Sequence, residues 1–156
     1  MKTSFLVIGK TTEDYLKEGM SIYEKRLKNY ISFESRLIPE IKNTANLSFD
    51  QQKNMEGKLL LNALSPADTI VLLDENGKNF SSTEFAQFLQ KHMLQSTKSM
   101  VFVIGGPYGF SKEMYARAND KISLSRMTFS HQMVRLIFLE QLYRAMTILK
   151  NEPYHH

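Results

Sequence analysis

Short apolar segments alternate with longer amphipathic ones along almost the whole chain, and this alternation constrains the fold more than any other feature. Compact apolar runs typical of buried strands occur at residues 4–8, 69–73, 100–104 and 122–124, and residues 31–37 show the period-two alternation of another strand. Segments with helical spacing occur at 12–30, 50–64, 81–95 and 111–119, and the last begins at Ser130 or His131 and ends at 149. Strands that alternate with helices predict an α/β fold, with a mostly parallel sheet covered on both faces by helices.

Two serines mark helix starts in this pattern. The segment Ser81–Glu84 has the sequence of a capping box, in which the serine and the glutamate each bind the free amide of the other. Ser111 is placed to cap the helix that follows the glycine-rich segment. After the strand at 69–73, the residues DENGK are expected to form a turn.

The chain length and composition are those of one compact unit. The 156 residues are 42% hydrophobic and contain no internal repeat or linker, so we predict a single domain over residues 1–156. No apolar stretch reaches the roughly 18–20 residues that span a bilayer, and the N-terminal apolar run is interpreted as a strand instead of a signal peptide. We therefore expect a cytoplasmic protein that does not enter a membrane.

The net charge and the small number of cysteine and histidine residues limit which partners and ligands we expect the chain to bind. There is no cysteine, and the four histidines are scattered, so we expect no disulfide and no metal site. The formal net charge of +4 and the pI of about 9.2 favour an anionic partner such as RNA. Ordinary solvated helix faces explain the lysines of the first third equally well.

The segment VFVIGGPYGFS, residues 101–111, is the first candidate for a ligand site. A strand that ends in glycines before a capped helix lets main-chain amides approach a ligand closely. In open α/β sheets, ligands bind at the carboxyl ends of strands, where this loop lies. A tight turn without a ligand is the alternative. The absence of GxGxxG argues against a nicotinamide dinucleotide.

The segment ISLSRMTFSHQMVR, residues 122–135, is the second candidate. Ser125, Thr128, Ser130 and His131 gather where a strand leads into the last helix, and their hydroxyl groups and exposed amides can hold an adenine or ribose edge. The alternative is a helix N-cap at Ser130, with His131 as a structural residue of the first turn.

The C-terminal NEPYHH, residues 151–156, is the third candidate. Pro153 ends the helix, Tyr154 can stack on an RNA base, and a histidine such as His155 can exchange protons near neutral pH. The alternatives are a disordered chain end and a purification-tag remnant.

The last helix is apolar on nearly its whole circumference. Such a helix must be buried on every side. In a domain of this size, one face can meet the sheet while another meets a second subunit, so we expect a homodimer with an isologous interface.

The segments VFVIGGPYGF, SLSRMTFSHQMVRLIFLEQLYRA and NEPYHH together resemble the RlmH family of SPOUT methyltransferases. FLVIGK, YEKRL and LLDENGK fit as well, so the resemblance covers essentially the whole chain. It implies a homodimer that uses S-adenosylmethionine to methylate N3 of a pseudouridine in 23S rRNA, with the 70S ribosome as substrate. It also implies a C-terminal trefoil knot that forms the cofactor pocket.

The matched motifs assign residues to this site. The resemblance implies that Leu73, Gly105 and Gly106 lie beside the cofactor, and that the adenosine-binding loop comprises Ser125, Arg126, Met127, Thr128, Phe129 and Ser130. It places His131, Arg135, Tyr154 and His155 near the reacting base or the RNA. We hypothesise that His155 accepts the N3 proton, that Tyr154 stacks on or orients the base, and that Arg135 binds phosphate or stabilises negative charge.

One departure from the family concerns the last residue. Relatives often carry Lys or Arg after the Tyr-His pair, whereas this chain ends in His156, which is either native or derived from a tag. The resemblance implies that Tyr154 and His155 belong to the natural sequence. The departure at His156 weakens any expectation that a permanent cation at the C-terminus binds phosphate.

Three other functions compete with this interpretation. The first is a SPOUT enzyme that methylates another RNA position or a ribose hydroxyl. The second is a flavodoxin-like module that binds a nucleotide phosphate with the glycine loop and catalyses nothing. The third is a structural dimer that binds ribosomes through a basic face, without a cofactor, and whose binding is strongly salt-sensitive.

Overall fold

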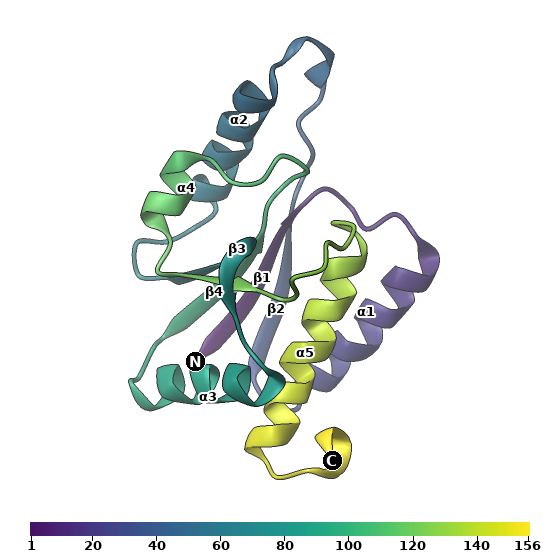
Figure 1. Cartoon of the computed structure of the whole chain (residues 1–156), viewed down its shortest axis with the longest axis vertical. Coiled ribbons are helices and arrows are strands. Elements are labelled where there is room, and N and C mark those ends of the chain that lie inside the picture. The colour runs from purple at the N-terminus through teal and green to yellow at the C-terminus, as the bar shows by residue number, and fades with distance from the viewer.

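The computed structural model describes residues 1–156 and contains one five-stranded sheet whose strands are all parallel, in the order β2-β1-β4-β3-β5 (Figure 1). The strands are β1 (Lys2–Ile8), β2 (Ser32–Ile38), β3 (Thr69–Asn79), β4 (Ser99–Ile104) and β5 (Asp120–Ser123). The helices are α1 (Asp14–Leu27), α2 (Phe49–Asn62), α3 (Ser82–Leu94), α4 (Lys112–Arg117) and α5 (Met133–Leu149), with short 3-10 turns η1 (Thr44–Asn46) and η2 (Pro153–His155). The predicted α/β fold is confirmed.

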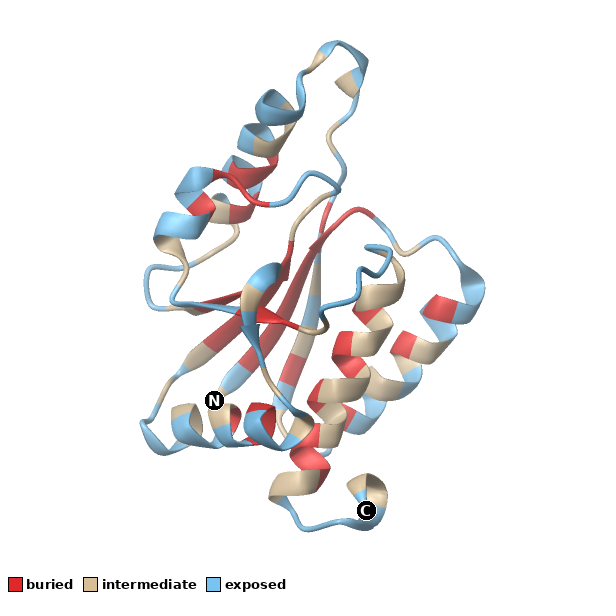
Figure 2. Cartoon of the chain, viewed as in Figure 1, coloured by how far each residue is buried: buried red, intermediate tan, exposed pale blue.

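Successive side chains of the central strands enter two separate cores. In β1, Phe5 and Val7 pack with the core under α1, α3 and α5, whereas Leu6 and Ile8 pack with the core under α2 and α4. Figure 2 shows the buried residues gathered on the sheet and on the helix sides that face it. A strand buried on both faces needs an unbroken apolar sequence, which explains the apolar runs of β1 and β4.

The helix caps follow the sequence closely in two places. The Ser81 hydroxyl accepts from the Glu84 amide at 3.1 Å, and the Glu84 carboxylate accepts from the Ser81 amide at 2.6 Å, so the capping box is confirmed. Ser111 caps α4 as predicted, through the amide of Met114. A further capping box, Ser48 with Gln51, opens α2.

The start of α5 was expected at Ser130 or His131 but lies at Met133. Ser130 still acts as a cap, because its hydroxyl accepts from the Met133 amide at 3.1 Å and its carbonyl accepts from the Val134 amide at 3.0 Å. The two residues between them form a turn. Gln132 joins this turn to the chain after β1, because it bonds the Thr12 amide and the Lys10 carbonyl.

The DENGK segment, expected to be a turn, is an irregular part of β3. The pairing of β3 with β5 shifts register between Leu73 and Lys78, so the intervening residues bulge while the strand continues. A Cβ on Gly77 would lie 2.6 Å from the main-chain nitrogen of Ile122, so only glycine permits this close approach of the strands. The bulge places Asp74 and Glu75 near the carboxyl ends of β4 and β5.

Helix α5 packs against both α1 and α3 and contributes Phe138 to the centre of one core. The Phe138 ring lies 4.7 Å from that of Phe5 and 4.9 Å from that of Phe102, between ring centroids. Within one chain α5 is not covered on all sides, because residues such as Val134 and Ile137 are only half-buried. None of the helices is long and apolar enough to cross a membrane.

We expect Phe138→Ala to lower the free energy of unfolding by about 3–5 kcal/mol, because the packed sheet and helices cannot close the cavity it leaves. Urea unfolding followed by circular dichroism, at equal protein concentrations, measures this. Phe49→Ala is the control: its side chain is 67% exposed, and the expected loss is below about 1 kcal/mol. Equal losses would contradict the central placement of Phe138.

Candidate functional site

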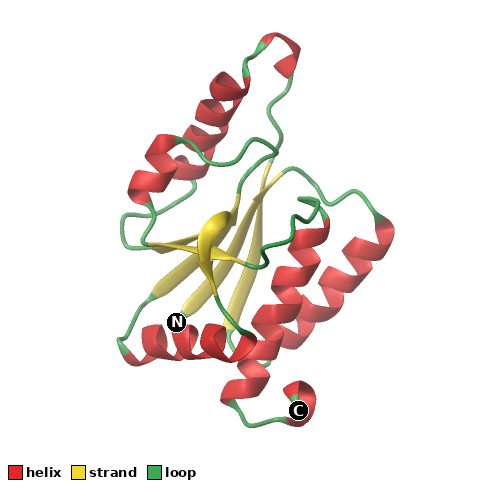
Figure 3. Ribbon diagram, in the orientation of Figure 1, coloured by secondary structure: helices red, strands yellow, loops and turns green.

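A cavity of about 250 Å³ lies at the carboxyl ends of β4 and β5 and at the bulge of β3, beside the N-terminal end of α5. Figure 3 shows the loops that meet there, including the long one between β5 and α5. Its walls are Leu73, Asp74, Glu75, Ile104, Gly105, Gly106, Pro107, Gly109, Phe110, Ser123, Leu124, Ser125, Met127, Thr128, Phe129, His131 and Val134. The parallel sheet therefore brings three distant segments to one edge, as expected for ligand sites in open α/β sheets.

Most residues assigned to the cofactor from the sequence line this cavity. They are Leu73, Gly105, Gly106, Ser125, Met127, Thr128 and Phe129. Arg126 and Ser130 belong to the same loop but do not line it. The loop is held by the Ser125 hydroxyl, which accepts from the Met127 amide at 2.9 Å, and by the Ser125 carbonyl, which accepts from the Ser123 hydroxyl at 2.9 Å.

The charged groups around the cavity are acidic. Asp74 and Glu75 line it with His131, and its walls contain no lysine or arginine. One oxygen of Asp74 accepts a 2.6 Å hydrogen bond from Tyr115; burial, with this bond, raises the pKa of the Tyr115 hydroxyl to about 12. Such a lining favours a neutral or cationic ligand over a phosphate. No group of three His, Asp or Glu side chains that could hold a metal ion occurs.

The loop that contains Gly105 and Gly106, called the glycine loop, is closely packed against neighbouring side chains. A Cβ on Gly106 would overlap both carboxyl oxygens of Glu56, which approaches from α2. A Cβ on Gly105 would lie 3.1 Å from the ring of Phe110 and 3.2 Å from the Gly109 carbonyl. At both positions a larger residue would crowd its neighbours, so glycine is required. The sequence motifs indicate both glycines but not Glu56.

Arg135 lies in the interior, with 1% of its surface exposed, and does not line the cavity. Its guanidinium donates to the main-chain oxygens of Ile8 at 2.9 Å and Gly9 at 2.7 Å. It also donates to the His131 carbonyl at 3.3 Å and the Thr11 hydroxyl at 3.2 Å. Burial lowers the pKa of this guanidinium. Arg135 thus ties the start of α5 to the end of β1.

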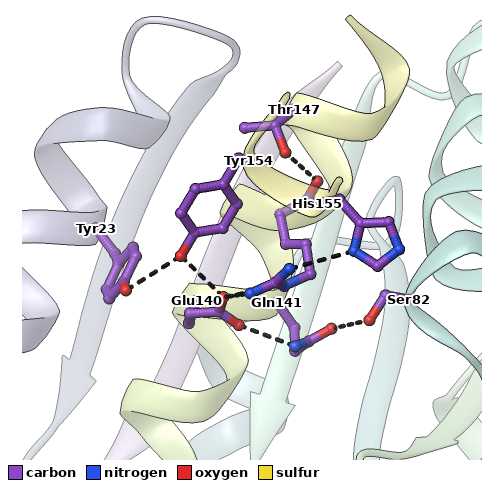
Figure 4. A network of polar contacts seen from close by, with 8 residues as sticks. Tyr23, Ser82, Glu140, Gln141, Thr147, Tyr154 and His155 are labelled. Carbon is purple, nitrogen blue, oxygen red and sulfur yellow. Dashed lines mark hydrogen bonds and ion pairs between the residues drawn. The ribbon is translucent and has the colours of Figure 1, made fainter. Parts of the chain in front are cut away.

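Tyr154 and His155 lie at the other end of α5, away from the cavity (Figure 1). Because α5 has 17 residues, its ends are about 25 Å apart. Figure 4 shows Tyr154 directed toward Tyr23 and Glu140. Its hydroxyl donates to the Glu140 carboxylate at 3.0 Å and lies 3.4 Å from the Tyr23 hydroxyl. One chain therefore does not bring all the predicted site residues together.

Two residues of this network, Glu140 and Arg144, were missed by sequence reasoning. They form a 2.7 Å ion pair one helical turn apart, and that i,i+4 spacing was the available signal. The hydrogen bond to Glu140 raises the pKa of Arg144. Burial raises the pKa of Tyr154, and its bonds to Tyr23 and Glu140 raise it further.

The contact with Arg144 also determines the tautomer of His155. One guanidinium nitrogen lies 3.2 Å from Nδ1 of His155. Because a guanidinium can only donate, Nδ1 must accept, and the ring hydrogen of His155 resides on Nε2. The Arg144 guanidinium lies over the Tyr154 ring, 4.7 Å from its centroid, so one arginine orients both C-terminal side chains.

Comparison with known proteins gives a consistent result. A family model described as "Predicted SPOUT methyltransferase" matches residues 1–155. A protein of Parabacteroides distasonis named "Ribosomal RNA large subunit methyltransferase H" is 59% identical, with 100% of this chain and 99% of that protein covered. Proteins with the same name from Christiangramia forsetii and Flavobacterium johnsoniae are 58% and 57% identical over the same shares.

We expect Gly106→Ala to destabilise the protein by about 1–3 kcal/mol, because its methyl group would overlap the Glu56 carboxyl group. In a Glu56→Ala background the same substitution should cost less, with a coupling of about 0.5–3 kcal/mol. Unfolding of the wild type, both single variants and the double variant measures the coupling. The same cost in both backgrounds would rule out the steric explanation.

Proposed function

The chain belongs to the SPOUT methyltransferase family, and from this premise we propose that it methylates N3 of a pseudouridine in 23S rRNA with S-adenosylmethionine as methyl donor. Relatives named for methylation of large-subunit ribosomal RNA, more than half identical over the full chain, support the rRNA substrate. The assembled 70S ribosome is the proposed form of that substrate. The single domain over residues 1–156 and the C-terminal trefoil knot implied by the family remain predictions.

The cavity at the strand ends is the observation that carries this proposal. Its apolar walls, such as Leu73 and Phe129, suit the flat faces of an adenine, and the hydroxyls of Ser125 and Thr128 suit its polar edges. The lining also has two carboxylates and no permanent cation, which suits a ligand with a sulfonium and an ammonium group. The same lining argues against the nucleotide-phosphate module.

We propose that Gly105, Gly106 and the loop of residues 125–130 hold the cofactor. When bound, S-adenosylmethionine supplies the electrophilic methyl carbon, so no metal is required. The chain's contribution is to hold the cofactor and the target base in line, which can contribute roughly 7–11 kcal/mol in favourable cases. His131 lines the cavity and is proposed to lie near the reacting base.

A homodimer would reunite the two halves of the site. The cavity and the pair Tyr154–His155 are separated by the length of α5, so one cavity and the C-terminus of a second subunit are proposed to form each complete site. The half-buried flank of α5, with Val134 and Ile137, supports an isologous interface. Both subunits are proposed to contact the rRNA.

The proposed roles at the reacting base follow from the contacts. Tyr154 would stack on or orient the base, and His155 would accept the N3 proton. In the single chain, His155 carries its hydrogen on Nε2, so it must leave Arg144 before Nδ1 can accept that proton. The contacts of Arg135 support a positioning role, and no contact supports phosphate binding by this residue.

Transfer of radiolabelled methyl from S-adenosylmethionine to ribosomes that lack the modification tests the activity. We expect label on intact 70S particles, little on free 23S rRNA, and N3-methylpseudouridine as the nucleoside identified by mass spectrometry. Label in another nucleoside would replace the proposed specificity with another SPOUT specificity. Absence of cofactor binding would refute the proposed function.

A subunit-mixing experiment tests the composite site. We expect His155→Ala to lower turnover about 10²–10⁴-fold, and Ser125→Trp to abolish it by filling the cavity. Co-expressed in equal amounts, the two inactive subunits should recover roughly a quarter of the wild-type sites, because half of the dimers are mixed and each has one intact site.

Each variant alone, at the same total concentration, is the control for this mixing experiment. No recovery would place the cavity and the C-terminal pair in one chain's site. Full turnover by His155→Ala would remove the proton-acceptor role.

A further inference from the structure

Glu56 is a buried carboxyl group that no described interaction explains. It lies on α2 with 4% of its surface exposed, and its Oε1 atom has no hydrogen-bond partner. Buried polar atoms are nearly always paired, because an unpaired one loses its hydration without compensation. An orphaned carboxyl oxygen in the interior therefore indicates a group that is satisfied only in another state of the protein.

The location of Glu56 suggests which state that is. Both carboxyl oxygens lie against the Cα of Gly106, in the space that a Cβ atom would occupy. Gly106 lines the cavity, whereas Glu56 does not. Gly106 therefore contacts this carboxyl group and is also part of the wall of the proposed cofactor site.

The surroundings of Glu56 supply no positive charge. Burial raises its pKa, a hydrogen bond with Gln52 on the same helix opposes this, and Glu40, after β2, raises it further. Arg135 on α5 lies near Glu40, but its guanidinium donates hydrogen bonds to the main-chain oxygens of Ile8 and Gly9 at the end of β1. Behind Gly57, α2 meets the uncharged Ser111 and Met114. These surroundings thus disfavour the ionised form of Glu56 in the free protein.

We propose that Glu56 is the counter-charge, placed behind the glycine loop, by which the cavity binds the cationic methyl donor more tightly than its neutral-sulfur product. This inference rests on the proposed function. S-adenosylmethionine and S-adenosylhomocysteine share the adenosine, ammonium and carboxylate groups and differ in the methyl group and the sulfonium charge. A buried carboxylate against a glycine of the cavity wall distinguishes them through that charge, since screening by water is weak in the interior. Loss of the charge on methyl transfer then favours release of the product.

A linked proton follows from the same arrangement. A cation in the cavity stabilises the ionised form of Glu56, so the donor lowers its pKa and releases a proton at pH values where Glu56 is protonated in the free protein. Because the pKa of Glu56 is raised in the free protein and falls in the complex, affinity for the donor increases with pH between these two pKa values. Affinity for the product depends less on the ionisation of Glu56, because the product lacks the sulfonium charge.

Titration calorimetry on the full-length protein tests the inference with both ligands. We expect Glu56→Gln to weaken S-adenosylmethionine binding by about tenfold and to change S-adenosylhomocysteine binding by less than about twofold. Glu113→Gln is the matched control: it removes the same formal charge from an exposed position on α4, and both affinities should stay as in the wild type. Equal weakening of both ligands by Glu56→Gln, or of neither, would overturn the inference and leave Glu56 a packing residue.

A measurement on the wild type covers the case in which Glu56→Gln does not fold. Titrations in two buffers of different ionisation enthalpy, near the pKa of Glu56, give the protons released on binding. We expect release with S-adenosylmethionine in excess of any release with S-adenosylhomocysteine, and equal release would overturn the inference. If the wild type binds neither ligand, the proposed function itself fails, whereas binding of both without a charge-dependent difference defeats only the role of Glu56.

Discussion

Burial of the central strands on both faces is the constraint on which the rest of this structure depends. Strands β1, β4 and β3 lie inside the sheet and send alternate side chains into two cores, so both faces need helices. Parallel pairing requires a crossover after each strand, and these crossovers are the helices. The carboxyl ends of β4 and β5 therefore lie at the same edge as the bulge of β3, and this bulge and the loops after β4 and β5 enclose the cavity.

The net charge of the chain and the charges around the cavity have opposite signs. The chain as a whole carries a formal charge of +4, which favours approach to an anionic RNA. The cavity has the opposite character, with Asp74 and Glu75 in its walls and Glu56 behind its glycine loop. The proposed methyl donor is cationic and the proposed substrate is polyanionic, so the acidic cavity would favour the donor and the net charge of the chain would favour the RNA.

Helix α5 connects the cavity to the C-terminal pair Tyr154–His155 and holds them one helix length apart. At its start, Arg135 binds the end of β1, and this positions the loop that precedes the helix against the cavity. At its end, Glu140 and Arg144 hold Tyr154 and His155 in a network of tyrosines and charged groups. A rigid helix cannot fold back on itself, so a site that uses both ends is proposed to need two copies of the chain.

The amino-acid sequence by itself determined the strand and helix order, the capping box at Ser81 and the segments that line the cavity, because each depends on neighbouring residues, on periodicity or on a family motif. The tertiary structure alone decided the continuation of β3 past Leu73, which depends on how closely β5 approaches Gly77. It also decided the partners of Arg135 and the position of Glu56 behind Gly106. These features arise between residues far apart in the chain, where packing and burial, which no local pattern encodes, select the contacts.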